Sequence, residues 1–273
     1  MRERGSMLGA VARSAVVLVL STAACRSTTP AGQGAPIGAA AIAPERVAPE
    51  YREDLRAVQS AQQADPAGAA VVQAADRLLG RDPPYNLRLA AVHAKVGHAY
   101  LNGDDAIAIR WADEILGAGA SAEAAGDAAE AGIVADLKRL RALLHARSGD
   151  PAFALTALDE AERARAITPG DLWAGRALAS ERAGSAAHAV HALGMWRSEV
   201  ADGSPEARYI ESRLAALATT APDALRRVAA RSPGTPAALC MAIMAGDSPV
   251  AAEPSWITAC APRKVRVGVL LPR

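Results

Sequence analysis

The sequence predicts an all-α fold built from antiparallel helical hairpins that stack one after another. Alanine dominates the chain and aromatic residues make up only 3% of it, a composition that favours helices packed closely through small side chains. Glycines end many of the amphipathic runs, and the loops between the runs are short, which places successive helices antiparallel. A residue that can cap a helix precedes a proline at four of the predicted helix starts, which are Asp65-Pro66, Asp150-Pro151, Thr168-Pro169 and Ser204-Pro205.

Residues 1–24 have the organisation of an export signal. Arg2, Arg4 and Arg13 supply positive charge, a short apolar run follows, and small residues end the segment. The apolar run is too short to cross a bilayer as a mature helix. Translation can instead start at Met7, which leaves Arg13 as the only arginine ahead of the run.

Cys25 follows this segment directly, and Leu20-Ser-Thr-Ala-Ala-Cys25 resembles the lipobox of bacterial lipoproteins, with Thr22 where leucine is usual. The resemblance implies that Cys25 is acylated and becomes the first residue of the mature chain; an ordinary cleaved signal is the alternative. Residues 25–49 are rich in small residues and proline, which predicts a flexible tether. Arg26 stands where an inner-membrane lipoprotein often has aspartate, so the resemblance favours the outer membrane.

The helical domain is predicted over residues 50–246 from amphipathic runs of about 12 to 20 residues. We expect its helices at residues 50–64, 66–79, 85–101, 104–117, 127–147, 151–166, 169–183, 185–201, 205–219, 222–231 and 236–245.

An internal period runs through three of the predicted hairpins. Turn glycines at 103, 149 and 184 are each followed five residues later by an alanine and then an aliphatic residue, and the last two glycines are 35 residues apart. The first two are 46 apart, which is about 34 plus an insertion of about 12 between Gly117 and Gly132. A helix–turn–helix unit of this length resembles the tetratricopeptide repeat over residues 85–202, and an irregular α-hairpin solenoid is the alternative. The positions expected to pack the repeats are Gly103, Gly149, Gly184, Ala108, Ala154 and Ala189.

The last part of the chain is predicted to leave the helical pattern. Cys240 and Cys260 form a disulfide if the protein is exported, or remain as two free buried thiols. Residues 247–263 are a turn-rich junction. Residues 264–273 contain alternating valines and then two leucines, which predicts one β-strand that has no partner strand in this sequence.

We recognise no set of catalytic or metal-binding residues in the sequence. His188 and His191 are three residues apart and provide at most half of a metal site. Trp111, Trp173 and Trp196 are expected in the core, and become candidates for partner binding only if exposed. The net charge of +1 gives no reason to expect nucleic-acid binding. We therefore expect a protein that is not an enzyme and needs no metal or cofactor.

The order of these parts resembles the penicillin-binding-protein activator lipoproteins. Those proteins have a lipidated cysteine, a tetratricopeptide-like domain and then a type I periplasmic-binding-protein domain. The first strand of that second domain is matched here by Lys264-Val-Arg-Val-Gly-Val-Leu-Leu-Pro272, with Arg273 where leucine is usual.

The resemblance implies a non-catalytic envelope lipoprotein, anchored in the outer membrane and facing the periplasm. Its expected partner is a protein, a peptidoglycan synthase, and its expected role is to regulate peptidoglycan synthesis. The alternative is the N-terminal part of a periplasmic receptor of the amino-acid-binding type, whose ligand domain is absent from this sequence. Neither interpretation places a small-molecule ligand in this chain.

Overall fold

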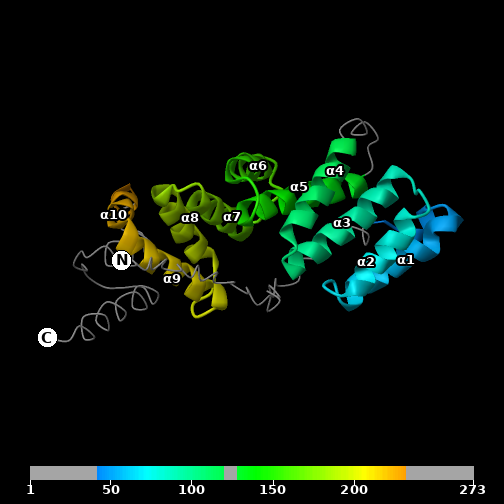
Figure 1. Cartoon of the computed structure of the whole chain (residues 1–273), viewed down its shortest axis with the longest axis horizontal. Coiled ribbons are helices and arrows are strands. Elements are labelled where there is room, and N and C mark those ends of the chain that lie inside the picture. The colour runs from blue at the N-terminus through cyan, green and yellow to red at the C-terminus, as the bar shows by residue number, and fades with distance from the viewer. Residues whose placement is uncertain (1–41, 120–127, 232–273) are drawn as a thin grey trace, which may run out of the picture. The chain divides into compact units, whose positions relative to one another are not determined.

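The computed structural model describes residues 42–119 and 128–231, and this part of the chain folds as helices without a strand (Figure 1). The predictions for Cys25, Cys240, Cys260, the 236–245 helix and the 264–273 strand lie outside it. The elements in order are η2 (Pro44–Arg46), α1 (Pro49–Ala64), α2 (Ala69–Leu79), α3 (Tyr85–Asn102), α4 (Asp105–Gly119), α5 (Ala128–Arg147), α6 (Pro151–Arg163), α7 (Pro169–Arg182), α8 (Ala186–Glu199), α9 (Pro205–Thr220) and α10 (Pro222–Arg231).

The helices pair as successive hairpins and stack as a solenoid, so the predicted all-α class is confirmed. Within the hairpins α1 packs on α2, α3 on α4, α5 on α6, α7 on α8 and α9 on α10. The first helices of successive hairpins also touch, because α3 contacts α5 and α5 contacts α7. Each hairpin therefore buries its apolar face against its neighbours, as in other repeat proteins.

Three of the four predicted helix caps are present. In each, the side-chain oxygen accepts a backbone N–H that has no partner inside the helix. Asp150 accepts from Ala152 at 2.8 Å, Thr168 from Asp171 at 3.2 Å and Ser204 from Ala207 at 3.0 Å.

The fourth cap prediction, at Asp65, is wrong. Asp65 ends α1, and its carboxylate accepts the Ala67 N–H, at 3.1 Å, within a turn. The next helix starts later than predicted, at Ala69, and its N-cap residue is Gly68, which has no side chain to cap the helix. A capping residue before a proline thus forms a short turn here rather than a helix start.

The packed part of the chain also begins before the predicted end of the tether at residue 49. Ile42 and Val47 are buried against α1, and η2 lies between them. Side chains of α1 hold this segment, because Arg52 donates to the Val47 carbonyl at 2.8 Å and Gln59 donates to that of Ile42 at 2.9 Å. The segment covers apolar surface at the first helix of the array.

The predicted repeat positions have distinct physical roles. Ala108, Ala154 and Ala189 have no exposed surface, so each lies where a larger side chain would not fit. Gly103 adopts a φ of 81°, the left-handed conformation that glycine takes at little cost. At Gly149 the constraint is space, because a Cβ there would lie 2.5 Å from Nδ1 of His145.

The last residues of α3, α5 and α7 each bind backbone carbonyls of the preceding hairpin. Asn102 donates to the Ala67 carbonyl at 3.0 Å, and Arg147 donates to that of Tyr100 at 3.0 Å. The third tie is the Arg182 guanidinium, which donates to the carbonyls of His145, Ala146, Ser148 and Gly149. The acceptors lie in turns or at helix ends, and the carbonyls of Tyr100 and His145 also accept the backbone N–H groups of Gly103 and Gly149.

Candidate functional site

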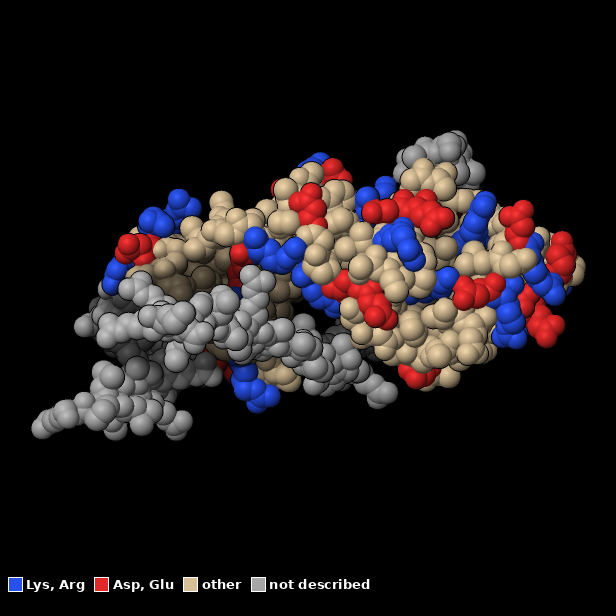
Figure 2. Space-filling view, viewed as in Figure 1, with Lys and Arg blue, Asp and Glu red and all other residues tan. Residues whose placement is uncertain are grey.

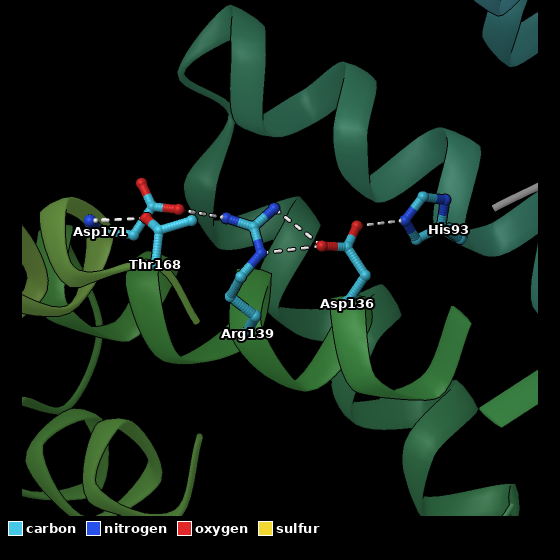
Figure 3. A network of polar contacts seen from close by, with 5 residues as sticks. All are labelled: His93, Asp136, Arg139, Thr168 and Asp171. Atoms are coloured by element: carbon cyan, nitrogen blue, oxygen red, sulfur yellow. Dashed lines mark hydrogen bonds and ion pairs between the residues drawn. The ribbon is translucent and has the colours of Figure 1, made fainter. Parts of the chain in front are cut away.

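A polar network joins the first helices of three successive hairpins, α3, α5 and α7 (Figure 3). His93 of α3 lies 2.7 Å from Asp136 of α5 through Nε2, and Arg139 binds the other oxygen of Asp136 at 2.8 Å. Arg139 also donates to Asp171 of α7 at 3.0 Å, and Asp171 takes part in the Thr168 cap. Within α5, Asp136 therefore contacts α3 and Arg139 contacts α7, and the two side chains are bonded to each other.

The charges of this network favour an ionised Asp136. Burial raises the pKa of the carboxyl, but the hydrogen bond with His93 and the positive charge of Arg139 outweigh it, so the pKa lies below its ordinary value of 3.8. An ionised carboxylate only accepts hydrogen bonds, which places a proton on Nε2 of His93. The other ring nitrogen, Nδ1, is buried with no hydrogen-bond partner among the described residues. We interpret the role of this network as structural: it fixes the first helices of the three hairpins relative to one another.

A candidate binding feature is a groove of about 640 Å³ between α5 and α6. Its floor is apolar and made mostly of methyl groups, and charged side chains stand around it. The apolar lining includes Ala131, Val134, Ala135, Phe153, Ala157 and Ala161, and the charged lining is Glu130, Lys138, Arg141 and Glu160.

The unequal lengths of the two helices explain the groove. The helix α5 has 20 residues whereas α6, which runs antiparallel to it, has 13. The first turns of α5 therefore extend beyond the end of α6 at Arg163 and leave part of the α5 surface uncovered. The repeat period is interrupted between Gly117 and Gly132, a stretch that includes the first residues of α5.

Two of the lining residues, Arg141 and Phe153, are part of a cluster of rings and charges. The guanidinium carbon of Arg141 lies 4.4 Å from the centre of the Phe153 ring, and His145 packs on the same ring with centroids 4.4 Å apart. Arg141 also pairs with Asp113 of α4. Phe153 thus contacts both a cation and an imidazole on the facing side of α5.

The tryptophans named from the sequence lie elsewhere, and each is half-buried in a contact of its own. Trp111 lies 4.3 Å below the Lys95 ammonium, and Trp173 contacts His191 edge to face at 5.6 Å. Trp196 packs on Tyr209 with ring centres 5.9 Å apart. None of the three lines the groove.

His188 and His191 make different contacts and do not form a joint site. Nδ1 of His188 lies 2.7 Å from the Ser185 hydroxyl, while His191 turns to the Trp173 ring. In residues 42–119 and 128–231 no group of three or more metal-binding side chains comes together. No helix in those ranges is long and apolar enough to span a membrane.

Basic and acidic side chains are interspersed on the face of the molecule in Figure 2, in keeping with the net charge of +1.

Comparison of the chain with protein-family models, with curated proteins and with solved structures found no match. The groove was not identified from the sequence, although the interrupted period between Gly117 and Gly132 marked its position.

Proposed function

We propose that the chain is a non-catalytic interaction scaffold whose α5–α6 groove receives a helix of a protein partner. The observation that supports this is the groove itself, about 640 Å³ in volume, with an apolar floor and a charged border. Interfaces of this kind bind the apolar face of an amphipathic helix.

The dimensions and lining of the groove define the segment that fits it. Its α5 wall runs from Ala128 to Arg141, about 20 Å at the helical rise of about 1.5 Å per residue, or about three and a half helical turns. The alanines of the lining let a second helix approach closely, since they project little beyond the backbone. The partner helix therefore presents aliphatic side chains over about three and a half turns.

The charges of the groove give this helix a direction. Glu130 and Glu160 lie toward the N-terminal end of α5, and Arg141 lies toward its C-terminal end. The N-terminus of a helix carries partial positive charge and its C-terminus partial negative charge. The partner helix is thus oriented parallel to α5, with basic residues near its start and acidic residues near its end.

A peptidoglycan synthase is the partner that we propose, with the chain exported and held at the outer membrane through Cys25. The support for this comes from the sequence, in the lipobox-like residues before Cys25 and the resemblance of residues 264–272 to penicillin-binding-protein activators. An interaction scaffold with a long helical array is suited to reaching a synthase across the periplasm.

The test uses the full-length chain and a purified bifunctional peptidoglycan synthase. Ala131 and Ala215 are both exposed helix alanines, but only Ala131 lines the groove. We expect Ala131→Arg to weaken synthase binding at least about tenfold, or about 1.4 kcal/mol, and Ala215→Arg to leave it unchanged. A photo-crosslinking residue in place of Ala131 should capture the synthase. Equal effects of the two substitutions, or no crosslink from position 131, would show that the groove is not the docking site.

A further inference from the structure

The turn between α5 and α6 is closed by a histidine that must be neutral. Nδ1 of His145 accepts the backbone N–H of Asp150 at 3.1 Å, so the ring proton is on Nε2. That nitrogen is buried and has no hydrogen-bond partner among the described residues. The carboxylate of Asp150 in turn caps α6 through Ala152 and Phe153. His145 therefore supports the start of the helix that carries Phe153.

Protonation is opposed by the surroundings of His145. Burial lowers its pKa from the ordinary value of 6.5 as the largest cause; Arg141 and Arg182 lower it further, and Asp113 and Asp150 raise it. These groups come from every side: Asp113 from α4, Arg141 from α5, Asp150 from the turn and Arg182 from α7. The Arg182 guanidinium donates to the His145 carbonyl at 2.8 Å.

We propose that His145 is an acid-sensitive switch that controls the position of Phe153 at the end of the α5–α6 groove. A protonated imidazole has no acceptor, so the Asp150 N–H loses its partner when His145 gains a proton. The new cation is repelled by Arg141 and Arg182 and attracted by the carboxylates of Asp113 and Asp150, so the ring turns.

Phe153 then loses its contact with the imidazole ring and shifts in the groove. Helix α6 also loses support at its first turn, since Asp150 is held in place by the bond to His145. Acid thus changes the lining of the groove. The consequence for partner binding rests on the proposed function, whereas the switch itself is a property of the free chain.

The only phenylalanine in the sequence is Phe153, which makes the switch directly measurable. Incorporation of 4-fluorophenylalanine into the full-length chain gives one ¹⁹F resonance, and a pH titration of that resonance reports on the groove. We expect it to shift with a midpoint below 6.5, the same midpoint as the His145 imidazole signals in the unsubstituted protein.

Two variants separate the switch from other titrations. His145→Asn keeps an acceptor at the Nδ1 position but cannot ionise, so the Phe153 resonance should become independent of pH between about 5 and 7. The matched control is His188→Asn, because Nδ1 of His188 also forms a hydrogen bond, to Ser185, far from the groove. In that variant the titration of Phe153 should be unchanged.

A Phe153 resonance that stays constant while His145 titrates would overturn the proposal, as would an unchanged titration in His145→Asn. The sample contains no partner, so a failed crosslink to the synthase leaves this result standing. Conversely, docking at Ala131 together with a constant Phe153 resonance would support the groove and reject the switch.

Discussion

Gly175→Ala is the substitution whose outcome tests the packing of the array most directly. Gly175 is buried in α7 at the point where this helix crosses α5 and α6. A Cβ at this position would lie 2.9 Å and 3.0 Å from the two methyl carbons of Leu158, and 3.1 Å from one of Leu143. Leu158 has no exposed surface and Leu143 is 7% exposed, so neither side chain has open space into which to move.

Two opposing effects set the change in the free energy of unfolding that Gly175→Ala causes. Alanine stabilises a helix interior by about 1 kcal/mol relative to glycine. Overpacking of a dense core costs about 1–3 kcal/mol. Gly97→Ala provides the control, because Gly97 lies inside α3 and a Cβ there meets nothing within 4 Å. The helix preference is common to both substitutions, so their difference isolates the packing cost of about 1–3 kcal/mol.

The assay is urea unfolding followed by far-ultraviolet circular dichroism, with thermal unfolding as a second measurement. We expect Gly97→Ala to raise the free energy of unfolding by about 0.5–1 kcal/mol and Gly175→Ala to lower it. In melting temperature, each kcal/mol corresponds to about 2–4 °C for a protein of this size. If Gly175→Ala stabilised the chain as much as Gly97→Ala does, the close approach of α7 to Leu158 and Leu143 would be refuted.

Two further substitutions test buried charges. Asp136→Asn should destabilise the chain by about 1–3 kcal/mol at neutral pH, because Arg139 and His93 lose an anionic acceptor. Because the pKa of Asp136 is lowered in the folded state, its contribution to stability is present above the unfolded pKa, near 3.8, and is lost as the pH falls through the folded pKa. The free energy of unfolding, measured in urea, should therefore decrease less on acidification in Asp136→Asn than in the unsubstituted protein. Arg197→Met should cost about 3–5 kcal/mol, since it removes the Arg197 cation at 3.3 Å from buried Glu211. The double variant Arg197→Met/Glu211→Leu should recover most of this loss, and an equally unstable double variant would show that the ion pair itself is needed.

Local signals in the sequence located most of the described helices to within a few residues. The helix predicted at residues 169–183 is found at Pro169–Arg182, and its Thr168 cap is present. Such features depend on hydrogen bonds between residues three or four apart, which the sequence displays directly. Asp65 shows the limit of these signals, because the same local pattern allows either a helix start or a turn.

The contacts between hairpins had no such local signal. The bond between His93 and Asp136 joins residues 43 apart, and the one between Arg139 and Asp171 joins residues 32 apart. In the sequence each of these residues is an ordinary polar position on a helix. Their pairing depends on how far each helix is rotated about its axis when the hairpins stack.

The sequence by itself thus determined the helical class and the order and approximate positions of the helices in the described residues, since composition, caps and glycines act within a few residues. Only the tertiary structure decided where the groove lies and which side chains surround His145. An interrupted repeat period indicated extra residues between Gly117 and Gly132, but not that α5 would be longer than α6, by 20 residues to 13. That outcome depends on packing between helices, which is a property of the folded array and not of any one segment.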